Sequence, residues 1–195
     1  MISPVLHDTG QPRPRLALLV NGVPGVGKST LAVQLSDGLD LPLLSKDAVK
    51  ETLLDELGFD GRDGSRRLRA AAGEVVWSIL ADCPGGGIVD SWLATDIRDV
   101  VRAGLTRARI DLVVEIWCSA PPPVVRHRVK ERSHRRHTGH FDNRAGADLE
   151  RWLETAAPLA LGPVITVDTS RPIDTSELLE QIGEYLRRRP QGPAR

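Results

Sequence analysis

The sequence has few of the features on which secreted or membrane-spanning proteins depend. Its 195 residues contain two cysteines, Cys83 and Cys118, which lie far apart and lack the spacing of a metal site. No apolar run approaches the roughly 20 residues needed to span a bilayer, and residues 1–15 contain no apolar segment typical of a signal peptide. We therefore expect a soluble protein of the cytoplasm.

The chain also lacks an excess of charge of either sign. Lys plus Arg and Asp plus Glu each number 26, which gives a net charge of +0. This balance gives no global electrostatic reason to bind nucleic acid or a membrane. The length suits one domain with a substantial core. We expect a flexible arm at 1–14, a single domain at 15–188 and a flexible tail at 189–195.

What the sequence does contain is a complete G-x-x-x-x-G-K-[ST] motif, called the P-loop below. Its residues are Gly22, Val23, Pro24, Gly25, Val26, Gly27, Lys28, Ser29 and Thr30. Glycines let backbone N–H groups surround a phosphate, Lys28 reaches the β- and γ-phosphates, and the Ser29 hydroxyl ligates Mg²⁺. An apolar run at 16–20 predicts a strand before the loop, and residues 29–35 predict a helix after it. The helix N-terminus adds its dipole to this predicted triphosphate site.

The rest of the chain alternates short apolar runs with amphipathic stretches. We expect further strands at 41–44, 88–90, 111–118 and 163–168. We expect helices at 46–57, 66–81, 96–107, 124–132, 148–156 and 174–188, with a polar loop at 58–65 and another at 133–146. In the second of these helices an apolar stripe includes Val75 and Ile79, and Trp77 lies off the stripe, where it could line a pocket. The alternation predicts an α/β fold with a parallel sheet covered on both faces.

The residues after the third strand help to choose among P-loop proteins. Asp90 ends that strand and is followed by Ser91 and Trp92. A hydrolytic motor commonly has a Glu directly after this Asp to position water, so the motor class is disfavoured. No Asn-Lys-x-Asp segment for guanine is present, and this favours ATP as the nucleotide.

The chain resembles the small P-loop kinases, a group that includes polynucleotide 5′-hydroxyl kinase, gluconate kinase, shikimate kinase and chloramphenicol phosphotransferase. The resemblance implies a three-layer P-loop NTPase fold, strand order 2-3-1-4-5 and a mobile lid at about 126–147. Residues 44–50 resemble the basic-Asp-x-x-basic patch of the polynucleotide kinase branch. This makes Asp47 the candidate general base for the acceptor hydroxyl and Lys50 a candidate contact to an anionic part of the substrate. Alternatively, Asp47 only complements its helix dipole.

The resemblance also assigns roles at the end of the third strand. Asp90 matches the acid that holds Mg²⁺ directly or through water, with a structural cap as the alternative. Kinases of the polynucleotide branch tend to have Asp-Thr-Asn at this point, where this chain has Trp92. The tryptophan either offers a stacking face to the substrate or packs as an ordinary core residue.

Arginines follow the fourth and fifth strands. Arg128 and Arg132 share a helix face and resemble the pair that stacks on adenine and touches the phosphates, which makes Arg132 a catalytic candidate. Arg135 and Arg136 could add a phosphate contact, and Arg171 resembles a residue near adenine. A solvated basic helix end and a plain turn are the alternatives. His127, His134, His137 and His140 lack ligand partners at familiar spacing, so we do not expect zinc.

These observations predict an ATP- and Mg²⁺-dependent kinase that phosphorylates a hydroxyl of a small molecule. Six basic residues between Arg126 and Arg136 form a local phosphate-binding footprint. A polynucleotide 5′-hydroxyl kinase is therefore the alternative enzyme. An ATP-dependent binding module or switch is the non-enzymatic alternative.

Overall fold

The computed structural model describes residues 14–133 and 145–187. The predicted arm, apart from residue 14, and the predicted tail lie outside this range, as does the part of the predicted lid from 134 to 144. Within the described part, no helix is both long enough and apolar enough to cross a membrane.

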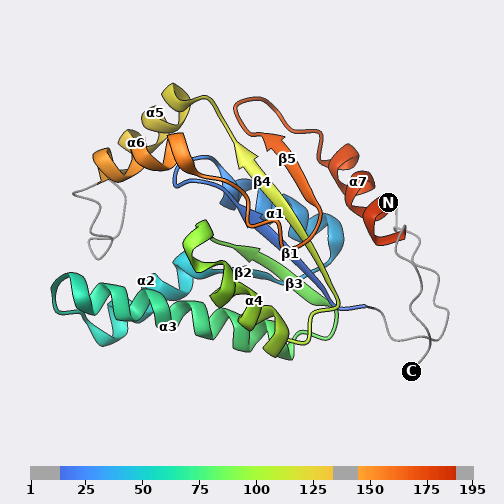
Figure 1. Cartoon of the computed structure of the whole chain (residues 1–195), viewed down its shortest axis with the longest axis horizontal. Helices are drawn as coiled ribbons and strands as arrows, with labels where there is room; N and C mark the ends of the chain where they lie inside the picture. Colours follow the sequence, from blue (N-terminus) through green and yellow to red (C-terminus); the bar gives the residue numbers. More distant parts are fainter. Residues whose placement is uncertain (1–13, 134–144, 188–195) are drawn as a thin grey trace.

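A five-stranded parallel sheet forms the centre of the molecule (Figure 1). Its strands are β1 (Leu16–Asn21), β2 (Leu43–Ser45), β3 (Gly86–Asp90), β4 (Leu112–Ser119) and β5 (Val164–Asp168). They lie in the order β2-β3-β1-β4-β5, which confirms the predicted order. Asp90 pairs in register with Val20 on one side and with Ser45 on the other. The segments that follow β1, β2 and β3 therefore begin at one edge of the sheet.

Helices cover both faces of this sheet. They are α1 (Lys28–Leu39), α2 (Lys46–Leu57), α3 (Gly61–Asp82), α4 (Arg98–Arg107), α5 (Pro122–Ser133), α6 (Ala145–Thr155) and α7 (Thr175–Arg187), with a 3₁₀ turn, η1 (Thr95–Ile97), before α4. In Figure 1, α1 and α7 lie on one side of the sheet and α3 and α4 on the other. The molecule is therefore the three-layer α/β structure that the sequence predicts.

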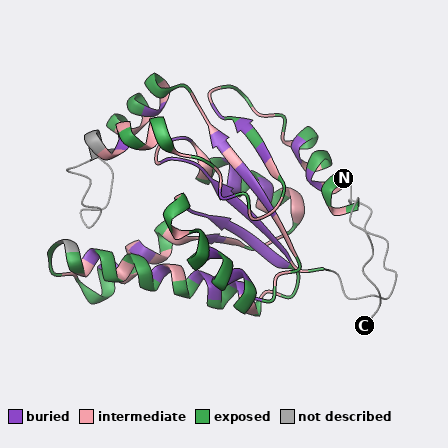
Figure 2. Ribbon diagram, in the orientation of Figure 1, coloured by how far each residue is buried: buried purple, intermediate pink, exposed green. Residues whose placement is uncertain are grey.

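Successive side chains of β1 point to opposite faces of the sheet and so belong to two separate apolar cores. Leu18 and Val20 pack with α1 and α7 residues such as Leu35 and Ile182. Ala17 and Leu19 point to the opposite face and pack with residues of α3 and α4. A strand covered on both sides buries every residue, and β1 is buried throughout (Figure 2).

The third helix differs from its prediction. It begins at Gly61, so the polar loop predicted at 58–65 is confined to residues 58–60, and the prediction is wrong for 61–65. The backbone N–H of Gly64 donates to the carbonyl of Asp60 at 3.1 Å, which closes the first turn. Packing of α3 along α2 accounts for a helix where glycines and polar residues disfavour one.

The apolar face of α3 is also rotated from its prediction. Val75 and Ile79 are 37% and 42% exposed. Trp77 is 4% exposed and lies in the core, where its ring stands 2.5 Å from the place that a Cβ on Gly104 would occupy. Glycine at 104 lets α4 approach the indole, so Trp77 fills the contact between α3 and α4.

Candidate functional site

The P-loop connects β1 to α1 in a conformation that requires glycine. Gly22 has φ 141°, and a Cβ on it would stand 2.5 Å from the carbonyl oxygen of Cys118 on β4. Gly27 has φ 109° and directly precedes α1. Both positions combine positive φ with close packing or a helix start, which only glycine tolerates readily. The backbone is thus arranged to present N–H groups at the N-terminus of α1.

A buried amide fixes the entry to the P-loop. Asn21 is 0% exposed, and its Oδ1 accepts hydrogen bonds from the backbone N–H groups of Gly22 at 2.7 Å and Leu93 at 2.9 Å. Its Nδ2 donates to the Leu93 carbonyl at 2.9 Å and to Glu115 Oε1 at 2.8 Å. The side chain joins the P-loop to the segment that follows β3.

The carboxylate of Glu115 extends this network to the segment before β5. Glu115 lies on β4 and is 0% exposed. Its two oxygens accept hydrogen bonds from the backbone N–H groups of Leu159 at 2.9 Å and Ala160 at 2.8 Å. The sequence analysis did not identify Asn21 or Glu115. The available signal was a polar residue within or at the end of an otherwise apolar strand, which in a buried strand must have partners.

The charged groups predicted for catalysis come together at the carboxyl edge of the sheet. Ser29, the predicted Mg²⁺ ligand of the P-loop, shares a side-chain hydrogen bond with Asp90. Lys28 donates from Nζ to the Val23 carbonyl at 3.2 Å. Asp90, Asp47 and Arg132 all act electrostatically on Lys28. The structure therefore gathers residues from four segments of the chain around the P-loop lysine.

Burial sets the protonation tendencies of this cluster. It lowers the pKa of Lys28, against the opposing effect of the Asp90 and Asp47 carboxylates. It also raises the pKa of Asp90, although the Ser29 hydrogen bond and the Lys28 charge lower it. Each ionised group is thus disfavoured by desolvation and supported by its neighbours.

The residues after β2 begin the helix that carries the predicted base. Ser45 caps α2, and its Oγ accepts a hydrogen bond from the N–H of Ala48 at 3.4 Å. Asp47 is exposed in the first turn of α2, and Lys50 is 6% exposed one turn later. The cap sets the start of α2 and so the position of Asp47, whose charge acts on Lys28.

Arg128 extends from α5 to the P-loop. Its Nη1 donates to the carbonyl of Val26 at 2.9 Å and its Nη2 to the carbonyl of Thr169 at 2.8 Å. The Thr169 hydroxyl donates to the same Val26 carbonyl. These bonds hold the guanidinium across the junction of P-loop, α5 and the turn after β5.

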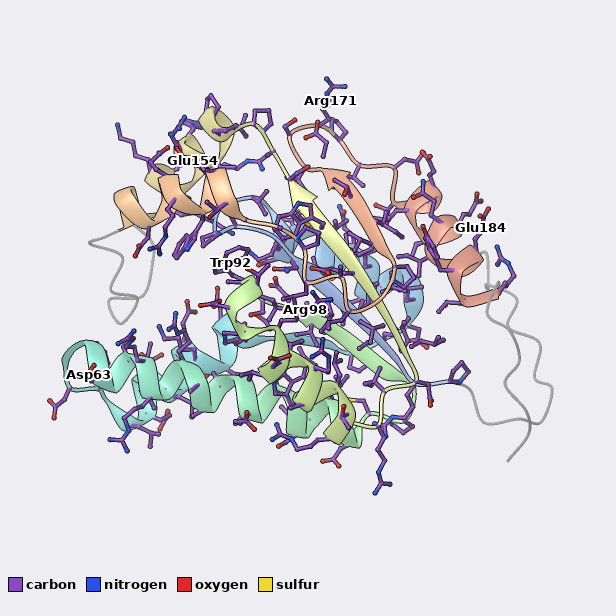
Figure 3. All side chains as sticks on the ribbon, in the orientation of Figure 1. Asp63, Trp92, Arg98, Glu154, Arg171 and Glu184 are labelled. Carbon is purple, nitrogen blue, oxygen red and sulfur yellow. The ribbon has the colours of Figure 1, made fainter. Side chains whose placement is uncertain are left out.

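A cavity of about 430 Å³ lies beside this junction. Its lining comes from the P-loop, α1, α5 and the turn after β5, and includes Gly27, Thr30, Arg128, Arg132 and Arg171. Arg171 is largely exposed and its Nε lies 3.8 Å from Asp168 Oδ2; Figure 3 shows its side chain pointing outward from that turn. The volume lies in the range of small-ligand pockets.

Trp92 lies in a group of three tryptophans. Its ring centroid is 6.4 Å from that of Trp117 on β4 and 6.0 Å from that of Trp152 on α6. The side chain is half-buried and packs against the core on the α1 side of the sheet. Figure 3 shows it at the start of the segment after β3, beneath α6. Its predicted role as a stacking face for the substrate stays a prediction.

Two more predictions concern the basic stretch after β4. Arg126 does not extend into solution as a free cation, because Nε and Nη2 donate to the two oxygens of Glu150 at 2.7 and 2.6 Å. His127 Nε2 lies 3.4 Å from Glu131 Oε1. The residues Arg135, Arg136, His134, His137 and His140 lie outside the described range.

Comparisons with known proteins agree with this geometry. The family model of the AAA domain AAA_33 matches residues 18–159. Among solved structures, a proposed kinase from Chloroflexus aurantiacus is 35% identical, with a TM-score of 0.76, covering 89% of this chain and 98% of that one. No curated protein sequence matches the chain.

Two other solved structures share the fold at lower identity. A sugar kinase from Janibacter is 22% identical, with a TM-score of 0.56 and coverage of 89% and 95% of the two chains. A shikimate kinase from Acinetobacter baumannii in complex with shikimate is 15% identical, with a TM-score of 0.57 and coverage of 89% and 93%. With the P-loop, the sheet order and the family match together, the chain belongs to the AAA_33 group within the small P-loop kinases.

Proposed function

We propose that the protein is an ATP-dependent kinase that transfers the γ-phosphate to a hydroxyl group of a small molecule. The observation that carries this proposal is the convergence of Lys28, Asp47 and Asp90 at one edge of the sheet. A switch or hydrolase activates water and has no need of a carboxylate on α2. A kinase needs an acceptor for the proton of a particular hydroxyl, and Asp47, whose charge acts on the P-loop lysine, would take this role.

The residues fit Mg²⁺–ATP. P-loop N–H groups and Lys28 would bind the phosphates, and the cavity beside Arg128 would receive the adenine. Ser29 and Asp90 would hold the metal, since their hydrogen bond brings a hydroxyl and a carboxylate oxygen together, and hard oxygen ligands suit Mg²⁺. When bound, Mg²⁺ supplies positive charge that offsets the negative charge of the phosphates. Within the described residues, no group of three or more acidic, His or Cys side chains forms a separate metal site.

The transfer step then assigns a task to each side chain. A bond forms between the acceptor oxygen and the γ-phosphorus, and the bond from that phosphorus to the β–γ bridging oxygen breaks, so ADP leaves with the electron pair. The Asp47 carboxylate takes the hydroxyl proton and later releases it to water. Lys28 and Arg132 stabilise negative charge on the transferred group, because both are cations that act in the same cluster as Asp90.

The hydrogen bonds made by arginines of helix α5 favour a small acceptor over a polynucleotide end. Arg126 is paired with Glu150, and Arg128 donates to two backbone carbonyls. The Arg128 guanidinium is therefore engaged within the protein, and a nucleic-acid phosphate could bind Arg126 only in competition with Glu150. The described part of the basic footprint is thus weaker than the sequence indicates.

The test is transfer of labelled γ-phosphate to a metabolite library that includes an oligonucleotide with a 5′-hydroxyl. We expect at least one small hydroxyl compound to be phosphorylated. Asp47→Asn should lower the transfer rate by about 10²–10⁴-fold with Mg²⁺–ATP affinity unchanged. Glu56→Gln removes an exposed carboxylate at the other end of α2 and should leave the rate unchanged.

Two results would contradict the proposal. Full transfer by Asp47→Asn would remove the assigned base. A much better rate with the oligonucleotide, and an affinity for it that falls steeply with salt, would replace the small acceptor with a nucleic-acid end.

A further inference from the structure

One carbonyl of the P-loop accepts hydrogen bonds from two distant parts of the chain. The Val26 oxygen is bound by Nη1 of Arg128, on α5, at 2.9 Å and by the hydroxyl of Thr169, in the turn after β5. The two donors lie 102 and 143 residues from Val26 in the sequence. Stacking on adenine, the role that the resemblance implies for Arg128, would use the face of the guanidinium and does not account for either bond.

The two donors are also held in place by each other and by the sheet. Nη2 of Arg128 donates to the backbone carbonyl of Thr169 at 2.8 Å. The N–H of Thr169 donates to the carbonyl of Ser119, at the end of β4, at 2.8 Å, and Thr169 is 8% exposed. A guanidinium and a hydroxyl that are fixed in this way can hold the Val26 carbonyl in one direction.

Helix α5 packs directly on the P-loop. A Cβ on Gly25, which has φ 83°, would stand 2.5 Å from Cγ2 of Val129. A Cβ on Gly27 would stand 3.5 Å from Nη1 of Arg128. The loop therefore lies against α5 on the side to which the Val26 carbonyl points.

The direction of this carbonyl decides the direction of an N–H group. In a trans peptide the C=O and the N–H of the same plane point in opposite directions. Because the Val26 oxygen points to Arg128 and Thr169, the N–H of Gly27 points away from them. Gly27 directly precedes α1, where free N–H groups and the helix dipole favour an anion.

Glycine at position 27 makes the two donors necessary. Rotation of this peptide plane changes ψ of Val26 and φ of Gly27, and glycine adopts positive and negative φ about equally readily. The backbone alone therefore does not select one orientation, and in the reverse one the carbonyl oxygen would repel the phosphates. The bonds to Val26 select the orientation that presents an N–H, and the cationic donor also polarises the peptide.

We propose that Arg128 and Thr169 are positioning residues of the triphosphate site. By binding the Val26 carbonyl they turn the N–H of Gly27 toward the phosphates and strengthen it as a donor. The inference rests on the nucleotide site of the proposed function and not on the transfer step, so binding measurements alone can test it.

The experiment measures Kd in the presence of Mg²⁺ for three probes: ATP, tripolyphosphate, which has no base, and adenosine, which has no phosphate. Thr169→Val keeps the shape of the side chain and the charge of the site but removes the hydroxyl. Its Kd for ATP and for tripolyphosphate should rise by about 3- to 10-fold, as for one hydrogen bond, with Kd for adenosine unchanged. Thr169→Ser keeps the hydroxyl and should restore wild-type affinity.

Matched controls separate positioning from other effects. Ser170→Ala removes the neighbouring hydroxyl, which donates to Asp168 Oδ1 at 2.6 Å within its own turn, and should leave every Kd unchanged. Arg128→Gln should raise Kd for tripolyphosphate by about 10- to 100-fold, as for a hydrogen bond from a charged group. Arg126→Gln removes an equal charge from the same helix, where it pairs with Glu150, and should change that Kd little. Lost stacking cannot produce this difference, because tripolyphosphate has no base.

Nuclear magnetic resonance of the Gly27 amide gives a local readout. Its proton should move downfield when Mg²⁺ and tripolyphosphate are added to the wild type, and by less in Thr169→Val; Arg128→Gln gives the same test if Thr169→Val does not fold. Wild-type affinity for tripolyphosphate in both variants, or a Gly27 shift equal to that of the wild type, would overturn the inference.

Failure of the kinase function has a different signature. Absence of phosphoryl transfer to every acceptor would contradict that function alone and would leave these binding results unchanged. A wild-type protein that bound neither ATP nor tripolyphosphate would refute the triphosphate site and the inference together.

Discussion

The buried carboxylate of Glu115 gives the sharpest prediction for the fold. It accepts hydrogen bonds from Asn21 Nδ2, from Leu159 N–H and from Ala160 N–H, at 2.8, 2.9 and 2.8 Å. The first two donate to Oε1 and the third to Oε2. Every donor that faces this side chain therefore requires an oxygen, and an amide offers only one.

Glu115→Gln keeps the size of the side chain but cannot satisfy all three donors. In its better orientation the amide oxygen replaces Oε1, and the amide nitrogen then faces the N–H of Ala160. One hydrogen bond is lost and two donors are opposed, which should cost about 1–3 kcal/mol of unfolding free energy. Glu115→Leu leaves all three donors unpaired and should cost at least about 3 kcal/mol by the same reasoning.

Equilibrium urea unfolding measures both variants, with Glu74→Gln as the matched control. Glu74 pairs with Arg107 at 2.6 Å, but both side chains are more than half exposed, at 55% and 57%. Loss of such a surface pair should cost about 0–1 kcal/mol. If Glu115→Gln lost no more stability than Glu74→Gln, the network would not hold the P-loop and the segment before β5 together as argued.

Three further predictions concern the charged and thiol groups around the P-loop. Lys28→Ala should reduce phosphoryl transfer sharply and weaken ATP binding, because backbone N–H groups cannot replace its point charge. Steady-state kinetics and ATP titration measure the two effects, and normal turnover in this variant would refute the assigned triphosphate site. Asp90→Asn should raise the Tm of the nucleotide-free protein, since the raised pKa of Asp90 means that its ionised form destabilises the fold above its unfolded-state pKa, yet the Mg²⁺ requirement for transfer should increase. Burial raises the pKa of Cys118 to about 12 from 9.0. The free energy of unfolding of the wild type should therefore fall by about 1.4 kcal/mol per pH unit between pH 9.0 and about 12. Unfolding of Cys118→Ala, measured over the same pH range, should lack this fall.

Local signals were sufficient for the elements that surround the nucleotide. The P-loop motif, the strand before it and the helix after it are defined by residues adjacent in sequence. The predicted start of α2 at Lys46 is local too and is confirmed, and the neighbouring Ser45 caps the helix. The sheet order came from the family resemblance, and the structure confirms it.

Features that depend on distant partners could not be predicted from the sequence. The first turns of α3 contain two glycines, and their helical state depends on packing against α2. Trp77 lies in the core because Gly104 on another helix makes room for its ring. The partner of Arg126 is Glu150, 24 residues away, so the sequence could not show that Arg126 is paired within the protein.

Buried ionisable groups differ between the candidate site and the Glu115 network in how well their neighbours stabilise the charged form. Glu115 is buried with a donor for each of its oxygens, so its place in the fold is stable without any ligand. Lys28, Asp90 and Lys46, in contrast, all have pKa values shifted toward the neutral form, chiefly by burial. A fold selected for stability alone would pair or expose such groups. Bound phosphates would add negative charge beside Lys28 and bound Mg²⁺ would add positive charge beside Asp90, so ligand binding would recover stability that the free site lacks.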